Sequence, residues 1–563
     1  MNKILAITNH FESSAALYFN QKVYAVSEER FTRIKNQGGM PVNSIAWLLA
    51  ESGLNFGDIE SFVYCSASDI YPDDDQYNEI INGIVNNKAA YDKKIILHRA
   101  LTEAVYNSKA IDDFKNWASL NKIPTSKIKY LDHHQAHALG VVNFYELNDS
   151  IIFTCDGKGG FTSSAVWDWS KNGLNRLNIN GSHNSLGYLY GNYTIGLGYK
   201  AERHEGKLTG LAAFSDPPNG FEKLNPFKVS DGKIIGENFE GIYMPFFNRE
   251  NSSKYSLNKF EETIKGWSRE QAAAAAQSSL ETTIMAWIEQ SMLENKGRNI
   301  CLSGGVFANV KLNQKIREHF KNSIVYVNPA MGDMGLVLGA ADTGTKINST
   351  FGAYLGPNYD SLDIINSLDK GKYKITNISN IDELVDLSID KFESRMPFGF
   401  FHGSMEFGPR ALCHRSIIYP AVDIKANDFL NERMNRSDFM PFAPVVLDID
   451  AEKFFHGYSP NQITSEFMTM TYDCTNEFTD RAPAVVHVDK TARPQILKRS
   501  RDPWFYDYLY TFTRKTGQAC LMNTSFNNHE EPIVCSPVDA ISSLDRKNVD
   551  VVVLSKKYLI ERF

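Results

Sequence analysis

The chain has 563 residues, of which 43% are hydrophobic and 22% are charged, and these values are ordinary for a globular protein. Its length exceeds what one hydrophobic core usually serves, so two or more domains are expected. The net charge of −7 and the pI near 6.0 disfavour a nucleic-acid-binding protein, which needs a basic surface.

The seven cysteines are scattered without a CxxC pair, which is typical of reduced, buried thiols in a cytoplasmic protein. Residues 1–8 turn polar too soon for a signal peptide. No apolar run reaches the ~18 residues that a membrane helix requires. We therefore expect a cytoplasmic protein that does not enter a membrane.

Near the N-terminus the sequence predicts a strand at residues 3–7, a polar loop, and a hairpin of strands at 15–19 and 23–26. After roughly 147 residues the same layout returns, with a strand at 151–155, a glycine loop and a strand at 162–169. A unit of this kind seen twice favours a duplicated α/β domain. The actin-like (ASKHA) fold, with its ribonuclease-H-like halves, is built in this way, and its two loops face a nucleotide cleft.

Charged residues are concentrated at 27–35, and residues 41–56 and 86–118 have the spacing of helices that cover a sheet. The charged segment has two interpretations. It is either a solvated loop or an anion-binding edge in which Arg33 and Lys35 lie near a phosphate.

Three histidines occur within residues 133–137. If this segment opens a helix, His133 and His137 lie on one face and can reach one metal ion. Asp156 follows the buried strand of the second unit, and Asp333 lies in a glycine-flanked loop after a short strand. Two histidines and two aspartates suit a divalent ion such as Fe²⁺, Mn²⁺ or Zn²⁺. The alternative is an ordinary polar helix start.

Two further segments of the N-terminal half carry polar groups beside glycines. Residues 202–211 include Glu205 and Lys207 and are predicted to form an active-site loop, with a surface turn as the alternative. Gly304 and Gly305 stand between a predicted strand and a predicted helix, with Asn309 just after them. Free backbone N–H groups at such a junction suit a phosphate or a ribose.

A stretch rich in Gly, Asn, Ser, Asp and Pro at 343–370 predicts the boundary between a domain at 1–355 and a second domain at 360–563. The second domain contains three arginines in motifs suited to gripping an anion, and a loop of short polar side chains after a strand at 519–521. The residues concerned are Arg410, Arg415, Arg493, Asn523 and Ser525. Together they favour a phosphorylated substrate, although each arginine alone could form a surface salt bridge.

Taken together, these motifs resemble the O-carbamoyltransferases of nodulation-factor and antibiotic biosynthesis over nearly the whole chain. The motifs that carry the resemblance are the charged segment 28–33, His133-His134-x-x-His137-Ala138, Asp156-Gly157, Glu205-Gly206-Lys207 with Gly210-Leu211-Ala212, Ser303-Gly304-Gly305-Val306, Gly332-Asp333-x-Gly335, Met405 to Leu412 with Arg415-Ser416, Pro441 to Pro444, His487-Val488-Asp489 with Thr491-Ala492-Arg493, and Asn523 to Asn527.

The resemblance implies a fold and a reaction. The N-terminal domain would be actin-like, similar to tRNA threonylcarbamoyl transferases, and would hold its metal through His133, His137, Asp156 and Asp333. The C-terminal domain would be a YrdC-like α/β domain that forms carbamoyl-AMP and pyrophosphate from carbamoyl phosphate and ATP, with Mg²⁺. The metal site would then deliver the carbamoyl group to a hydroxyl or amine of a small acceptor, such as a sugar or secondary metabolite. Passing the adenylate between joined domains would protect it from water.

Under the same resemblance, Arg410, Asn523 and Ser525 would bind carbamoyl phosphate or the adenylate. No nucleic acid or membrane partner is expected, and a homodimer is one of the oligomeric states that the sequence leaves open.

This chain departs from the family pattern at two places. Where a His-Asp pair usually stands after the first strand, it has Phe11 and Glu12. Glu12 is predicted to replace the aspartate as a base, and His10 is a second candidate that should point to the opposite side of an extended segment.

At the second place Met434 and Met440 replace a Lys and an Arg, although Arg433 and Arg436 stand close by. The two methionines motivate one alternative, a different adenylate-dependent transfer or condensation on the same fold. Two further alternatives stay open, a non-catalytic ATP- and metal-binding scaffold and transfer to tRNA, which the acidic balance disfavours.

Overall fold

A computed structural model describes residues 3–67, 69–240, 260–341, 352–360, 362–435 and 440–563. Its contacts divide the chain into two compact units. Unit 1 comprises residues 1–10 and 54–346, and unit 2 comprises residues 11–53 and 347–563. Both units combine β-sheets with covering helices, so the predicted α/β class is confirmed. The domain limits 1–355 and 360–563 stay a prediction.

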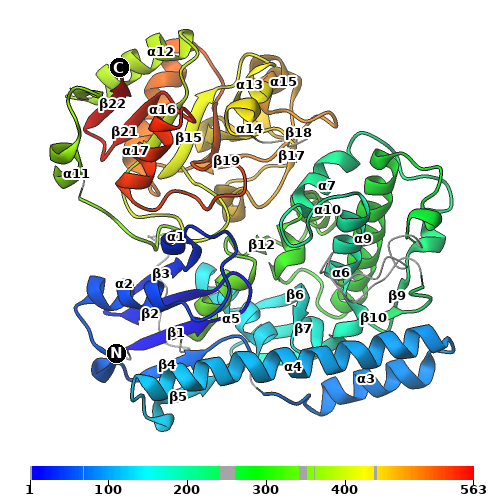
Figure 1. Ribbon diagram of the computed structural model, residues 1–563. Helices are drawn as coiled ribbons and strands as arrows, with labels where there is room; N and C mark the ends of the chain where they lie inside the picture. Colours follow the sequence, from blue (N-terminus) through cyan, green and yellow to red (C-terminus); the bar gives the residue numbers. More distant parts are fainter. Residues whose placement is uncertain (1–2, 68, 241–259, 342–351, 361, 436–439) are drawn as a thin grey trace. The chain divides into compact units, whose positions relative to one another are not determined.

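The first strands of unit 1 are parallel and buried. β1 (Ile4–Thr8) pairs with β4 (Ser61–Tyr64), which pairs in turn with β5 (Ile128–Tyr130). All residues of β1 and β4 are buried, as expected of parallel strands covered on both faces. The long helix α4 (Ala90–Leu120) runs beside α3 (Asp74–Asn86) in the same unit (Figure 1).

The second sheet of unit 1 has the strand order β12-β11-β6-β7-β8. Its members are β6 (Ser150–Gly159), β7 (Thr162–Ser170), β8 (Gly173–Gly181), β11 (Ile300–Ser303) and β12 (Val325–Val327). β6 to β8 form an antiparallel meander, whereas β11 runs parallel to both β6 and β12. A strand followed by a hairpin is also the order of elements at the start of the chain, as the sequence predicted. In both places parallel strands follow.

Helices of unit 1 carry several of the polar residues singled out above. They are α5 (His133–Tyr145), α6 (Leu186–Gly196), α7 (Glu205–Ala212), α9 (Arg269–Met292), α10 (Val310–His319) and the 3-10 helix η6 (Asp333–Ala340). α9 begins at the predicted capping box, in which the Ser268 side chain accepts from the Gln271 N–H group at 3.1 Å.

Unit 2 contains the hairpin of β2 (Ser14–Phe19) and β3 (Lys22–Ser27), the short helix α1 (Glu29–Thr32) and α2 (Val42–Ser52). Its large sheet has the order β13-β22-β21-β14-β15-β20-β16-β19. These strands are β13 (Tyr373–Asn377), β22 (Tyr558–Arg562), β21 (Val551–Leu554), β14 (Phe398–Phe401), β15 (Arg415–Pro420), β20 (Leu521–Ser525), β16 (Ala443–Leu447) and β19 (Gln495–Leu497).

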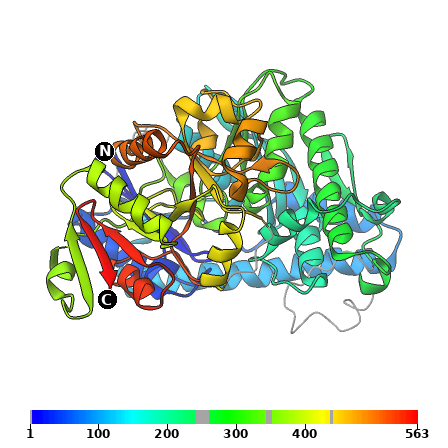
Figure 2. The same ribbon diagram turned by 90° about the horizontal axis from the view of Figure 1, so that it is seen from above.

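Helices α12 (Ile381–Glu393) and α16 (Pro503–Thr516) pack against each other over this sheet, and the chain ends after β22 (Figure 2). Phe392 of α12 meets Phe398 and Phe512 with ring centroids 4.9 and 5.9 Å apart. Phe392 thus links the neighbouring strand β14 to α16, which lies far away in the sequence.

Three local predictions were wrong. Residues 202–211 do not form a loop, because Glu205 begins helix α7. The strand predicted at 519–521 is shifted toward the C-terminus and becomes β20. Asp333, predicted to lie in a loop, instead begins the 3-10 helix η6. In each case short, glycine-containing or small-residue segments lacked a strong periodic signal.

All seven cysteines are buried, and none of them forms a disulfide. None of the described helices is both long enough and apolar enough to cross a bilayer.

Candidate active site

The histidine segment begins a helix, as the sequence predicted. Asp132 caps α5, and its side chain accepts a hydrogen bond from the Gln135 N–H group at 3.0 Å. Helical spacing then places His133 and His137 on one face, with ring centroids 4.8 Å apart. Both rings are buried, at 1% and 0% exposed.

Two carboxylates reach these rings from other elements. Asp156 lies in β6, and Asp333 begins η6 after the end of β12. His137 Nε2 is 3.3 Å from Asp156 Oδ2 and 3.8 Å from Asp333 Oδ1. His133 Nε2 is 3.5 Å from Asp333 Oδ1. One ligand atom from each of the four residues lies within 4.8 Å of the others, so the structure brings together the set predicted to bind metal.

The chemistry of this donor set fits a cation. His133 Nδ1 and Nε2 and His137 Nε2 are buried without hydrogen-bond partners in the described part of the chain. The neighbouring His134, by contrast, bonds through its two ring nitrogens to Thr154 Oγ1 and the Thr162 carbonyl, each at 3.0 Å. Buried nitrogens without partners are costly. A divalent ion would satisfy them and balance the two carboxylates.

Electrostatics of the cluster support the same conclusion. Burial lowers the pKa of His137, but Asp156 and Asp333 outweigh burial and raise it to about 9. Burial and the charge of Asp156 raise the pKa of Asp333 to about 6. Burial, followed by the neighbouring His137, lowers the pKa of His133 well below its ordinary value. The two carboxylates therefore favour a positive charge at His137, whereas the ring of His133 stays neutral.

The glycine pair predicted to bind phosphate supports Asp156. Asp156 Oδ2 accepts from the Gly305 N–H group at 2.8 Å, and Asp156 Oδ1 accepts from that of Gly157 at 2.6 Å. Gly304 has φ of 104°, and a Cβ there would lie 2.2 Å from the Cys155 carbonyl oxygen. Only glycine fits this close approach. The Gly304–Gly305 segment thus orients a carboxylate of the candidate metal centre.

Two more titratable side chains lie around the cluster. The rings of His10 and His133 have centroids 6.5 Å apart, and burial lowers the pKa of His10 to about 4. Lys158, on β6, was not predicted. Its ammonium lies 4.0 Å from the ring centroid of Tyr106, and its charge acts on His133 and Asp333. A single lysine after Asp156-Gly157 gave no periodic or spacing signal that could have identified it.

Three other predicted residues of unit 1 lie in helices. Glu205 opens α7, and burial raises the pKa of its carboxyl to about 7. Lys207, in the same helix, is buried at 9% exposed. Asn309 caps α10, where its Oδ1 accepts from the Leu312 N–H group at 3.0 Å, while its Nδ2 donates to Gln277 at 2.8 Å.

The charged segment of unit 2 is not a solvated loop, because Glu28, Glu29 and Arg30 are 2%, 6% and 4% exposed. Arg33 donates to the carbonyl oxygens of Pro532 and Ile533, each at 2.7 Å. The guanidinium predicted to lie near a phosphate is thus engaged with the backbone.

Two other predicted residues of this region are only partly buried. Lys35 is half-buried, and Glu12 is half-buried with a left-handed backbone, at φ of 57°.

Arg415 and Glu406 organise the loop that carries Arg410. The Arg415 guanidinium is fully buried and donates to four carbonyl oxygens, those of His402 (2.7 Å), Pro357 (3.1 Å), Gly403 (3.1 Å) and His414 (3.2 Å). One carboxylate oxygen of Glu406 accepts from the backbone N–H groups of Leu412 (2.7 Å), His414 (2.9 Å) and Arg415 (3.0 Å). Arg410 itself is half-buried, and its Nε has no hydrogen-bond partner among the described residues.

The remaining predicted anion-binding residues lie at one end of the large sheet or just outside it. Asn523, in β20, donates to Gln495 Oε1 at 2.6 Å, and Ser525 donates to Asn527 Oδ1 at 2.6 Å. Arg493 is half-buried, two residues before β19. Arg436 lies outside the described residues.

The two methionines that replace basic residues differ in burial. Met434 is 0% exposed at the end of α13 (Ala426–Arg433), whereas Met440 is half-buried. Arg433, next to Met434, pairs with Asp550 at 2.7 Å. Its guanidinium therefore has a protein partner already.

Comparisons with known proteins identify both halves of the chain. The family model for the carbamoyltransferase N-terminus matches residues 3–342, and the model for the carbamoyltransferase C-terminus matches residues 390–562. The uncharacterized protein MJ1051 of Methanocaldococcus jannaschii is 30% identical over 98% of both chains. Nodulation protein NolNO of Sinorhizobium fredii is 27% identical over 96% of this chain and 77% of its own.

Among solved structures, T. kodakarensis HypF shares 16% identity with a TM-score of 0.31, covering 60% of this chain and 46% of its own.

Proposed function

Because the chain belongs to the carbamoyltransferase family, we propose that it transfers a carbamoyl group from carbamoyl phosphate, by way of carbamoyl-AMP, to a hydroxyl or amine of a small biosynthetic acceptor. The observation that supports this most directly is the convergence of His133, His137, Asp156 and Asp333 within 4.8 Å. A sugar or secondary metabolite is the class of acceptor proposed.

The first half of the proposed reaction belongs to unit 2. Water and carbamoyl phosphate give carbamate and orthophosphate. A carbamate oxygen then attacks the α-phosphorus of Mg²⁺-bound ATP and releases pyrophosphate. Arg410, with its unpartnered Nε, is proposed to bind the anionic donor. Glu406 and Arg415 are proposed to hold the Arg410 loop in place, because their hydrogen bonds fix its backbone.

The second half of the proposed reaction belongs to unit 1, where the acceptor oxygen or nitrogen attacks the carbamoyl carbon and AMP leaves. A divalent ion held by the four ligands would supply Lewis-acid stabilisation of the departing phosphate. His10 is the proposed base, because its ring lies beside His133 and burial keeps it neutral. Glu12, Glu205 and Lys207 stay proposals for the handling of the acceptor.

Incubating the protein with ATP, Mg²⁺ and carbamoyl phosphate tests the proposal. Pyrophosphate and carbamoyl-AMP should both accumulate, and neither should form when carbamoyl phosphate is omitted. ATP consumption without a carbamoylated nucleotide would contradict the proposal.

A second candidate function is a different adenylate-dependent transfer or condensation. The observation that favours it is the full burial of Met434, because an apolar side chain packed there supplies no cation for a phosphate. The double variant Met434→Lys plus Met440→Arg separates the two. If carbamoyl-AMP forms only in the double variant, the wild-type chain uses another donor. If the wild type forms it too, the carbamoyl reaction stands.

A further inference from the structure

A second group of possible metal ligands lies in unit 2 and is used in none of the steps above. His402 and His414 stand at the two ends of the loop that joins β14 to β15, and Asp502 precedes α16. The His402 N–H group donates to the His414 carbonyl oxygen at 3.2 Å, so the two residues are direct neighbours across the base of the loop. Their rings lie with centroids 4.4 Å apart.

The distances in this group suit a single small cation. His414 Nε2 is 3.2 Å and His402 Nε2 is 3.7 Å from Asp502 Oδ2. One ligand atom from each residue lies within 4.8 Å of the other two. A tetrahedral ion with metal–ligand bonds of about 2.1 Å separates its ligand atoms by roughly 3.4 Å, so only small shifts are needed to enclose one.

The hydrogen-bonding pattern leaves two of the three facing atoms without hydrogen-bond partners among the described residues. His414 Nδ1 is 2.6 Å from the Ser404 carbonyl oxygen, which can only accept, so Nδ1 carries the proton and Nε2 presents a lone pair when the ring is neutral. Both nitrogens of His402 and Asp502 Oδ2 are buried with no hydrogen-bond partner among the described residues. A lone pair and a carboxylate oxygen that face each other repel unless a proton or a metal cation lies between them.

Other elements hold the three residues ready. Asp502 caps α16 and accepts from the Phe505 N–H group at 3.2 Å through Oδ1, which leaves Oδ2 turned to the histidines. The contact with Ser404 fixes the orientation of the His414 ring, as outer partners of metal-bound histidines do.

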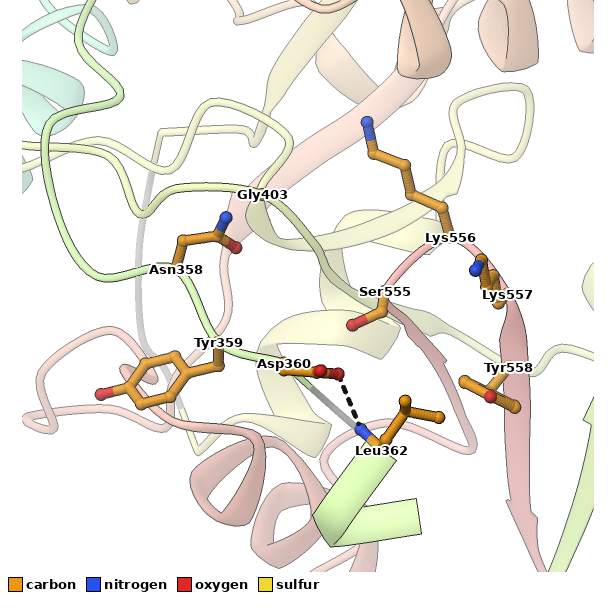
Figure 3. Close-up of a pocket in the computed structure, with 9 residues that line it drawn as sticks. All are labelled: Asn358, Tyr359, Asp360, Leu362, Gly403, Ser555, Lys556, Lys557 and Tyr558. Atoms are coloured by element: carbon orange, nitrogen blue, oxygen red, sulfur yellow. Dashed lines mark hydrogen bonds between the residues drawn. The ribbon is translucent and has the colours of Figure 1, made fainter.

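Solvent comes close to the cluster on one side. A cavity of about 470 Å³ is lined by Gly403, Ser555 and Lys556, among others (Figure 3). Gly403 has φ of 58°, and a Cβ there would lie 2.8 Å from His414 Cε1, so the His414 ring lies directly against this glycine. The His414 side chain remains 10% exposed. This side offers an entry path for an ion.

We propose that His402, His414 and Asp502 form a second divalent-metal site, of the two-histidine, one-carboxylate type, in unit 2. Such a set suits Zn²⁺ or Fe²⁺ and leaves a coordination position for water or another small ligand. The ion ties both ends of the Arg410 loop to the start of α16. The proposal does not depend on the reaction proposed above.

The test uses the full chain with the first centre disabled by His137→Ala plus Asp333→Asn. Titration with Co²⁺, followed by visible absorption, should show about one bound ion per chain, and added Zn²⁺ should displace it. Adding Asp502→Asn to this background should weaken binding by more than about 100-fold. Asparagine keeps the volume of the side chain and its capacity to cap α16.

His414→Asn in the same background is a second variant with the same expected loss, in case Asp502→Asn impairs folding. His456→Asn, which changes an exposed histidine of unit 2, should leave binding unchanged. Saturating Zn²⁺ should also raise the melting temperature of the background variant but not of the two binding variants. The proposal is overturned if the background variant binds no stoichiometric Co²⁺, or if both binding variants bind it as well as the background does.

Discussion

His137 Nε2 lies 3.3 Å from Asp156 Oδ2, although His137 belongs to helix α5 and Asp156 to strand β6. The neighbouring oxygen of Asp333 is 3.8 Å from the same nitrogen. Ser303 Oγ lies 3.3 Å from the other ring nitrogen of His137, so the ring is held from both sides. A buried imidazole placed in this way can bind a cation but has little freedom to reorient.

Replacing this histidine should separate the two halves of the proposed reaction. His137→Ala is expected to lower carbamoyl transfer to the acceptor by more than about 100-fold, because one of four ligands is lost. Formation of carbamoyl-AMP should continue at the wild-type rate, since the residues proposed for it lie in unit 2. Pyrophosphate release and carbamoylated product are the two quantities to measure.

The matched control is His98→Ala, which removes an exposed histidine of α4 and should change neither quantity. If transfer survives His137→Ala undiminished, the assignment of the four ligands is wrong.

Glu28 gives a prediction for stability. Its carboxylate is 2% exposed and accepts four hydrogen bonds from Asn43 and Ser44 at the start of α2, at 2.7 to 3.1 Å. Glu28→Ala leaves these donors unpaired and should cost about 2–4 kcal/mol of unfolding free energy. Hydrogen exchange of the α2 backbone amides should become faster in this variant.

Glu51→Ala, in the exposed last turn of the same helix, should leave that exchange nearly unchanged. Equal effects of the two substitutions would mean that the Glu28 hydrogen bonds contribute little.

The stability of unit 2 should also be sensitive to a conservative substitution of Arg415. Lysine cannot reproduce a planar guanidinium that donates to four carbonyl oxygens from a fully buried position. Arg415→Lys is therefore expected to destabilise unit 2 by about 3–5 kcal/mol, measured by denaturant titration.

Arg499→Lys is the control for Arg415, because within the described ranges the exposed Arg499 pairs only with Asp507, at 3.0 Å. It should cost less than about 1 kcal/mol. A wild-type denaturation midpoint for Arg415→Lys would rule out the structural role given to this arginine.

Glu205 predicts a pH dependence of stability. Burial raises the pKa of its carboxyl from 4.5 to about 7, so the folded protein holds a proton that the unfolded chain has lost. The stabilising effect of that proton is full below about pH 4.5 and disappears as the pH rises through about 7. The melting temperature of the wild type should therefore fall more between about pH 5 and pH 8 than that of Glu205→Gln, which stays neutral.

Glu222→Gln, at an exposed glutamate, should keep the wild-type slope. If the melting temperatures of the wild type and Glu205→Gln fall equally with pH, Glu205 is ionised throughout this range.

Local patterns in the sequence were sufficient for much of the fold. The apolar run at 151–155 predicted β6, and the Ser268–Gln271 capping box predicted the start of α9. Likewise, the four-residue spacing of His133 and His137 required only that a helix begin there. Each of these depends on interactions within a few residues, which the sequence displays directly.

The partners of the charged side chains required the tertiary structure. In the sequence, Arg33 and Arg415 both fitted an anion-binding role. In the structure, both donate to backbone carbonyl groups, and those bonded to Arg33 lie about 500 positions away along the chain. The cluster of His402, His414 and Asp502 has no recognisable spacing, because a hairpin loop and a helix start bring it together.

The sequence by itself thus determined elements with a clear local signal, such as β6, the start of α9 and the histidine pair of α5, since these follow from short-range patterns. Only the tertiary structure decided which buried polar groups bond to one another and which have no hydrogen-bond partner among the described residues, because burial and long-range packing set that outcome.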